Sequence, residues 1–190
     1  FSVCTGLTDL TIEDGVKEIG YNAFDDCTGL VSVVIPASVT SIGSLAFDRC
    51  TALAAITVDP ANLFYSSRDG ILYDKLQTEL LFVPRGIAGV VTVPGTVTSI
   101  GDRAFQYCVH LTGMTIASGV KTIGDSAFEG CTGLIAVTIE QGVESIGASA
   151  FAICSSLAAV EIPGSVGRIG SRAFQGCTAL ADLVIGSGVT

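Results

Sequence analysis

The chain has 190 residues, of which 49% are hydrophobic, with 23 glycines and no tryptophan. Nine Lys and Arg against eighteen Asp and Glu give a formal net charge of −9, which argues against binding to nucleic acid or to an anionic membrane surface. The sequence has no run of 18 apolar residues, so we expect no direct membrane insertion in this segment.

A fixed spacing of cysteines defines an internal repeat. The gap between them is 23 residues, except that Cys50 and Cys108 are separated by two repeats plus twelve residues. The full set is Cys4, Cys27, Cys50, Cys108, Cys131, Cys154 and Cys177. A period in this range predicts a solenoid, in which each repeat buries its apolar face only by stacking on its neighbours. We interpret residues 1–190 as a single array, and as a fragment open at both ends because Phe1 and Thr190 both interrupt a repeat.

Each repeat begins with a segment L-x-x-V-x-I that ends in strand-like alternation, as at Val33 and Ile35. This predicts one short strand per repeat, and strands that always run in the same sense form a parallel sheet. Eight such strands are expected, centred near residues 11, 34, 57, 92, 115, 138, 161 and 184.

Two further segments complete the repeat. In V-x-x-I-G the chain should turn back across the coil, with a glycine where a Cβ would block the backbone. The segment A-F-x-x-C is too short for an α-helix, and we expect a single 3₁₀-like turn. Seven of the nine phenylalanines occupy this segment, which predicts that phenylalanine forms the core. Because the segment is short, we expect little α-helix.

One coil departs from the pattern. Residues 59–88 lack the cysteine signature and contain two apolar runs, 71–73 and 80–83, separated by the polar segment 74–79. The polar segment is typical of a hairpin turn, and Asp69-Gly70 is typical of a preceding tight turn. We predict a variant coil with a hairpin insertion. Such an insertion is often functional, although a purely structural variant coil is the alternative.

The repeat I-G-x-x-A-F-x-x-C-x-x-L-x-x-V-x-I-P-x-x-V resembles the BspA-type (Treponema-type) leucine-rich repeat over essentially the whole chain. The variant coil, with S-R-D-G-I-L-Y-D at 67–74, resembles a form that recurs in that family. The resemblance implies a leucine-rich repeat solenoid. It also implies a secreted or cell-surface protein used in adhesion or in binding host or matrix proteins, and no shared catalytic residues.

The sequence offers little support for chemistry. Metal sites need ligands close in sequence, whereas these cysteines are at least 23 residues apart and the chain has a single histidine, His110. We therefore predict no metal, no cofactor and no catalytic residue. His110 lies two residues after Cys108, but we expect the thiol to point inward and the histidine outward. We interpret the cysteines as buried thiols, with disulfides between stacked coils as the alternative.

Candidate partner-binding residues fall into two sets. On the variant coil, aromatic and arginine side chains, which are enriched in binding hot spots, stand outside the repeat pattern at Phe64, Tyr65, Arg68 and Tyr73. On the predicted sheet, an outward-facing row contains Thr57, Thr92, Thr115 and Thr138. Strand propensity alone also explains these threonines, so an unoccupied sheet face is the alternative.

We therefore predict a non-enzymatic protein-interaction or adhesion module that binds a protein partner through a rigid, curved surface. The alternative is a structural spacer or scaffold segment within a larger assembly. An accessory domain of an enzyme is a third hypothesis, and it requires a catalytic domain outside this stretch.

Overall fold

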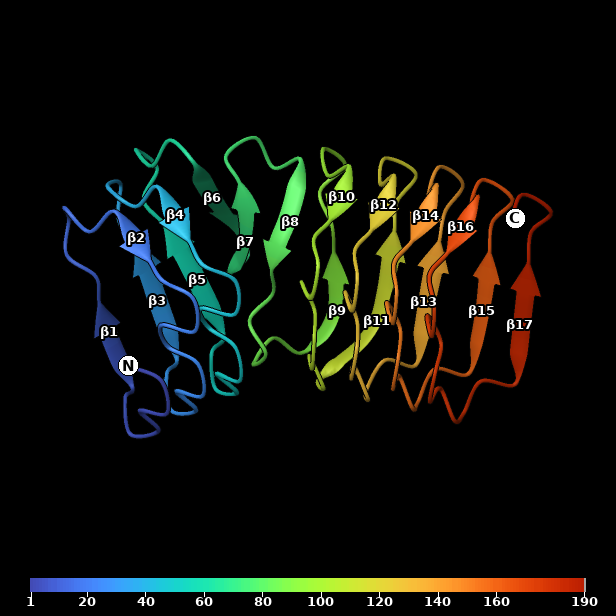
Figure 1. The fold of residues 1–190 in the computed structure, drawn as a ribbon, viewed down its shortest axis with the longest axis horizontal. Coiled ribbons are helices and arrows are strands. Elements are labelled where there is room, and N and C mark those ends of the chain that lie inside the picture. Colours follow the sequence, from blue (N-terminus) through green and yellow to red (C-terminus); the bar gives the residue numbers. More distant parts are fainter. Residues whose placement is uncertain (190) are drawn as a thin grey trace. The chain divides into compact units, whose positions relative to one another are not determined.

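The computed structural model describes residues 1–189, and within them every regular element is a β-strand. No helix in these residues is long and apolar enough to cross a bilayer. The chain divides into two compact units. Unit 1 comprises Phe1–Gln77 and Val83–Ile87, and unit 2 comprises Thr78–Phe82 and Ala88–Thr190. Each unit is a stack of coils built mainly from parallel strands (Figure 1).

The predicted parallel strands are all present and form one sheet in each unit. Pairing keeps repeat positions in register, so that Val33 lies opposite Ile56 and Thr115 opposite Thr138. In unit 1 the strands are β1 (Asp9–Thr11), β3 (Ser32–Ile35) and β5 (Ala55–Val58). In unit 2 they are β9 (Gly89–Thr92), β11 (Leu111–Ile116), β13 (Ala136–Ile139), β15 (Ala159–Ile162) and β17 (Asp182–Ile185).

A second ladder of short strands was not predicted. The V-x-x-I-G segment, expected only to turn the chain, instead contributes two extended residues to each regular coil. In unit 1 these are β2 (Glu18–Ile19) and β4 (Ser41–Ile42), which pair in parallel. In unit 2, β10 (Ser99–Ile100), β12 (Thr122–Ile123), β14 (Ser145–Ile146) and β16 (Arg168–Ile169) pair in series, and β8 (Glu79–Phe82) pairs with β10. This pairing satisfies backbone groups that a buried turn would leave without partners.

The glycine that follows this short strand is required by close backbone contact between coils. A Cβ at Gly43 would lie 2.4 Å from the backbone nitrogen of Tyr21, and one at Gly124 would lie 2.6 Å from that of Asp102. Because these obstacles are backbone atoms of the preceding coil, no side-chain adjustment can relieve them. The expected role of the glycine as a site of close approach is confirmed.

The A-F-x-x-C segment forms a series of turns rather than a 3₁₀-helix. Ala104 donates to the carbonyl of Gly101 and Cys108 to that of Phe105, which are the i→i+3 bonds of the predicted turn. Alternate amides instead donate to the carbonyls of the next coil: Arg103 to Asp125, Phe105 to Ala127 and Tyr107 to Glu129, at 2.9, 2.7 and 2.7 Å. Arg103 and Tyr107 adopt positive φ to achieve this alternation, with φ of 59° in both.

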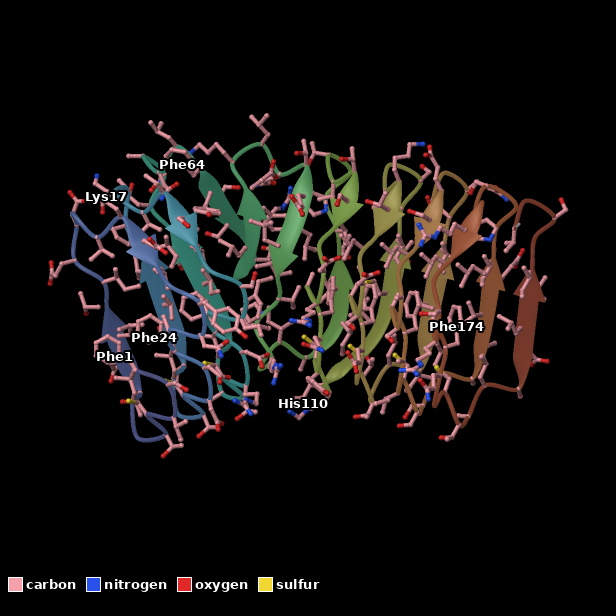
Figure 2. The ribbon with its side chains drawn as sticks, in the orientation of Figure 1. Phe1, Lys17, Phe24, Phe64, His110 and Phe174 are labelled. Atoms are coloured by element: carbon pink, nitrogen blue, oxygen red, sulfur yellow. The ribbon has the colours of Figure 1, made fainter. Side chains whose placement is uncertain are left out.

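The phenylalanines form the predicted core of each unit. In unit 1, Phe24 stacks between Phe1 and Phe47, with ring centroids 5.6 and 5.7 Å apart (Figure 2 labels Phe1 and Phe24). In unit 2 the stack runs through Phe105, Phe128, Phe151 and Phe174 at 4.6, 4.9 and 5.3 Å. Inward-facing valine and isoleucine from both ladders surround these rings, so each coil completes the core of its neighbour.

The variant coil contains a hairpin in unit 1, but it turns at the predicted tight turn Asp69-Gly70 and not at the polar segment 74–79. β6 (Tyr65–Arg68) pairs antiparallel with β7 (Ile71–Asp74), and Asp69 and Gly70, at φ of 52° and 79°, make the type I′ turn that Asp-Gly favours. The hairpin covers the open edge of β5. The amide of Ile56 donates to the carbonyl of Gly70 at 2.8 Å, and that of Val58 donates to Oγ of Ser67 at 2.9 Å.

Candidate binding surface

The outward row of the sheet lies where it was predicted. Thr57 in unit 1 and Thr92, Thr115 and Thr138 in unit 2 are all exposed, and the last three lie opposite one another on successive strands. The adjacent outward positions in unit 2 carry small residues, Gly113, Ala136 and Ala159. The same face also carries the exposed side chains of Val90, Glu161 and Val184, and it lacks the aromatic and arginine anchors that dominate binding energy at interfaces.

Two of the predicted aromatic anchors on the variant coil have structural roles. Tyr73 is only 1% exposed, so its expected place on the binding surface is wrong. The error arises because β7 belongs to the core on both faces, with Ile71 and Leu72 also buried. Tyr65 is half-buried, and its hydroxyl accepts a 3.1 Å hydrogen bond from the amide of Ile42 in the preceding coil.

The other two predicted residues are exposed but far apart. Phe64 is 50% exposed on the loop that precedes β6, and Figure 2 shows it at the outer margin of unit 1. Arg68 lies at the opposite end of β6, about 13 Å further along an extended strand. Its guanidinium lies 3.6 Å from the carboxylate of Asp69. The structure therefore does not bring Phe64 and Arg68 together.

Two leucines that sequence reasoning missed accompany Phe64. Leu63 and Leu76 are both 76% exposed. They are the chain neighbours of Asn62 and Lys75, and the Nζ of Lys75 donates a hydrogen bond to the carbonyl of Asn62. We call Leu63, Phe64 and Leu76 the apolar patch. Its sequence signal was the absence of any repeat position that would bury these side chains.

Asn62 fixes the loop that carries the patch. Its side chain is fully buried, and its Nδ2 donates to the carbonyls of Pro36 and Val39, both at 2.9 Å. Its Oδ1 accepts from the amides of Phe64 and Tyr65 at 2.8 and 2.9 Å. A single carboxamide thus joins the patch loop to the preceding coil. The loop therefore loses its conformational freedom when the chain folds, and a partner does not have to order it on binding.

Lys75 provides the second attachment of the loop. Its ammonium donates to the carbonyl of Pro60 at 3.0 Å as well as to that of Asn62. These bonds join the turn that follows β7 to the loop that precedes β6. The loop and the turn that carry the three apolar side chains are therefore joined through a fixed cation.

The thiols are buried hydrogen-bond donors. Five of the seven cysteines are buried, and none of the seven, which lie within residues 1–189, forms a disulfide. Cys131 Sγ donates to the carbonyl of Phe105 at 3.0 Å, and the same bond repeats one coil later from Cys154 to Phe128 at 3.2 Å. Burial raises the pKa of Cys50 and of Cys154 to about 12. Such thiols are poor nucleophiles and poor metal ligands.

Catalytic or metal-binding clusters are not evident in the described residues. Cys108 is buried whereas His110 is exposed, so a thiolate at 108 would have no access to a substrate. His110 lies at a turn on the margin of unit 2 (Figure 2). Among residues 1–189, no group of three or more His, Cys, Asp or Glu could hold a metal ion.

The repeat matches one known family of proteins over most of the chain. The BspA type leucine rich repeat region matches in six copies, over residues 1–73 and 89–190. The chain belongs to this family. The part outside the match, residues 74–88, is the second half of the variant coil. No curated protein sequence matches the chain.

Solved structures of bacterial leucine-rich repeat proteins share the fold. The pneumococcal vaccine antigen PcpA superimposes with a TM-score of 0.92 at 26% identity, over 99% of this chain and 47% of the antigen. A leucine rich cell surface protein from Faecalibacterium prausnitzii gives 0.67 at 27%, over 92% and 58%. A leucine-rich repeat protein from Eubacterium ventriosum gives 0.77 at 24%, over 96% and 56%, and shows the fold alone. The chain thus spans less than two thirds of the length of these proteins.

Proposed function

We propose that this chain is a non-enzymatic protein-interaction module of a secreted or cell-surface protein, and that it binds a protein partner through the apolar patch. The observation that carries the proposal is the exposure of Leu63, Phe64 and Leu76 on a loop that Asn62 and Lys75 hold in place. Large apolar side chains gathered on a fixed surface are typical of interaction sites. Likeness to a cell surface protein and to a vaccine antigen supports the location.

The patch is a better binding candidate than the sheet face. Burying a threonine or alanine side chain in an interface removes little apolar surface from water. Burying a leucine or phenylalanine side chain contributes roughly 1.5–3 kcal/mol to the free energy of binding. The patch also lies on the coil that breaks the repeat, and residues 74–88 lie outside the family match. Divergence at this coil would change partner choice without disturbing the stacked core.

A structural spacer is the second candidate, and the sheet face favours it. Thr92, Thr115 and Thr138 form a regular exposed row with Gly113 and Ala136 beside it. This face presents no aromatic or arginine side chain, and its largest apolar side chains are valines. Such a surface suits a segment whose role is to stack and to separate other parts of a protein.

A binding screen with paired variants separates the two candidates. The chain is immobilised and tested against purified extracellular matrix proteins and host plasma proteins, alongside Phe64→Ser/Leu76→Ser. The matched control is Val90→Ser/Val184→Ser, which removes two exposed apolar side chains from the sheet face of unit 2. Saturable binding that weakens at least tenfold only in the patch variant supports the module. Binding lost only in the control variant moves the site to the sheet, and no binding by folded protein favours the spacer.

A further inference from the structure

Lys75 is held by backbone carbonyls, whereas four other cations of the chain lie beside carboxylates. Arg49, Arg68, Arg85 and Lys121 each lie within 4.0 Å of a carboxylate. No such ion pair forms at Lys75 in the part of the chain that the structure describes. Its ammonium is instead fixed by two backbone carbonyls, those of Pro60 and Asn62. Carbonyl oxygens orient the charge but do not neutralise it.

One donor of this ammonium remains for a partner. A lysine ammonium has three N–H donors, and two of them are used within the loop. The ammonium lies close to the backbone of Leu63, because it contacts the carbonyl of the preceding residue, Asn62, and Leu76 follows Lys75 in the chain. An oriented cation next to exposed apolar side chains matches a ligand that carries a carboxylate next to an apolar side chain.

We propose that the apolar patch and Lys75 together bind a partner segment in which an Asp, Glu or C-terminal carboxylate stands beside a large apolar side chain. This inference rests on the proposed function, since it specifies the partner of the same surface. The apolar side chain contacts Leu63, Phe64 and Leu76, and the carboxylate accepts a charge-assisted hydrogen bond from Lys75. Closing the apolar contact excludes water from this bond and strengthens it.

The net charge of the chain shapes how such a partner binds. At −9 the chain repels an acidic segment at long range, so electrostatic steering does not accelerate the encounter. The affinity therefore depends on the short-range contact at Lys75. A change in this contact should alter mainly the dissociation rate of the complex. Raising the ionic strength screens the long-range repulsion and leaves the fixed contact largely intact.

The informative variant is Lys75→Gln. Glutamine can donate to both the Pro60 and Asn62 carbonyls, so it removes the charge while retaining the loop contacts. Lys75→Arg retains the charge. Lys121→Gln is the matched control, because it changes net charge equally at an exposed lysine in unit 2 that pairs with Glu144 at 3.6 Å. Hydrogen exchange of the Phe64 and Tyr65 amides checks that the loop is intact, since both donate to Asn62.

The probe is a phage-displayed library of random dodecapeptides selected on the whole chain. We expect selected peptides to carry Asp or Glu beside Leu, Ile or Phe. The best peptide should bind about tenfold more weakly to Lys75→Gln, normally to Lys121→Gln and near-normally to Lys75→Arg. Its Asp→Asn or Glu→Gln form should lose the same factor on the parent chain and nothing further on Lys75→Gln.

Several outcomes would overturn the inference. Peptides that lack a carboxylate, or affinities equal for the parent and Lys75→Gln with an intact loop, contradict it. If such peptides still depend on Phe64 and Leu76, the proposed binding patch stands and only the role of Lys75 fails. If no selected peptide responds to Phe64→Ser/Leu76→Ser, both proposals fail.

Discussion

The guanidinium of Arg85 donates a hydrogen bond to the carboxylate of Asp48, deep in unit 1. Arg85 lies 23 residues before Cys108, at the spacing where the repeat otherwise places a cysteine. It is only 5% exposed, so a buried ion pair stands where the regular coils bury a thiol. One coil earlier, Arg49 binds Asp25 through two hydrogen bonds, at 3.0 and 2.5 Å. The variant coil therefore contacts the preceding coil through an ion pair at the repeat position where the regular coils use a hydrogen bond from a buried thiol.

Removing one member of the buried pair should destabilise unit 1. Arg85→Ala leaves the mostly buried carboxylate of Asp48 with only a 3.9 Å contact to Arg49, and we expect a loss of about 3–5 kcal/mol in the free energy of unfolding by urea. Arg85→Met/Asp48→Leu should recover much of this loss, because it leaves no buried charge. The exposed Arg68→Ala serves as the control and should cost less than about 0.5 kcal/mol. Equal effects for Arg85→Ala and Arg68→Ala would contradict the assignment of a buried pair.

The buried thiols should resist alkylation in the folded chain. A pKa of about 12 for Cys154 in place of about 9 lowers the thiolate fraction at pH 8 by about a thousandfold, and burial blocks access as well. Iodoacetamide followed by peptide mass spectrometry should label Cys4, which is exposed, and leave Cys50, Cys131 and Cys154 unlabelled until urea is added. Rapid native labelling of Cys154 would show that these thiols are accessible.

The same thiols should make the folded chain less stable at alkaline pH. Burial raises the pKa of Cys50 and Cys154 to about 12, so the folded state retains protons that the unfolded state loses. Their contribution is complete below about pH 9 and declines as the pH rises toward 12. The expected slope is about −1.4 kcal/mol per pH unit for each thiol. Urea titrations between pH 8 and 11 should give a shallower slope for Cys154→Ala, and an unchanged slope would refute this account.

Shortening a stacked phenylalanine should be costly. Phe128 is fully buried between Phe105 and Phe151, with ring centroids 4.6 and 4.9 Å away. Phe128→Ala removes both contacts and leaves a cavity, and we expect a loss of about 3–5 kcal/mol in the free energy of unfolding. Phe64→Ala, at a half-exposed ring, is the control and should cost far less. Similar denaturation midpoints for the two variants would contradict the assignment of Phe128 to the core.

Removing the Asn62 carboxamide should release the patch loop. Asn62→Ala leaves the carbonyls of Pro36 and Val39 and the amides of Phe64 and Tyr65 without their partner, at an expected cost of about 3 kcal/mol or more. Hydrogen exchange should show faster exchange at the Phe64 and Tyr65 amides. Gln141→Ala removes an exposed carboxamide in unit 2 and should change neither quantity. Unaltered exchange in Asn62→Ala would show that the loop is held by other contacts.

Prediction from the sequence succeeded wherever a residue occupies a repeat position. The strands, the phenylalanine stack and the close approach at Gly124 all follow from a spacing that superimposes like residues. The second ladder was missed because two residues are too short to give a recognisable strand pattern. The left-handed backbone at Arg103 and Tyr107 was missed because it arises from hydrogen bonds to the next coil.

At the candidate site, the sequence pointed to the coil that carries the proposed patch, but of the patch residues it named only Phe64. Tyr73 looked like a surface aromatic because it stands outside the repeat, but the pairing of β7 buries it. Leu63 and Leu76 were not singled out from the sequence, yet both are exposed. Outside a repeat, whether a side chain is buried or exposed depends on how the hairpin packs, and local composition does not predict that packing.

By itself the sequence determined the architecture, because a 23-residue period can bury its apolar positions only by stacking them, and that stacking dictates the coil, the core and the inward thiols. Only the tertiary structure decided what the variant coil presents to solvent. Asn62 joins carbonyls that lie 26 and 23 residues before it, and Lys75 reaches residues 13 and 15 positions earlier. Such contacts form after the chain has folded back on itself, so they place the exposed leucines and the fixed cation together in a way that no local pattern predicts.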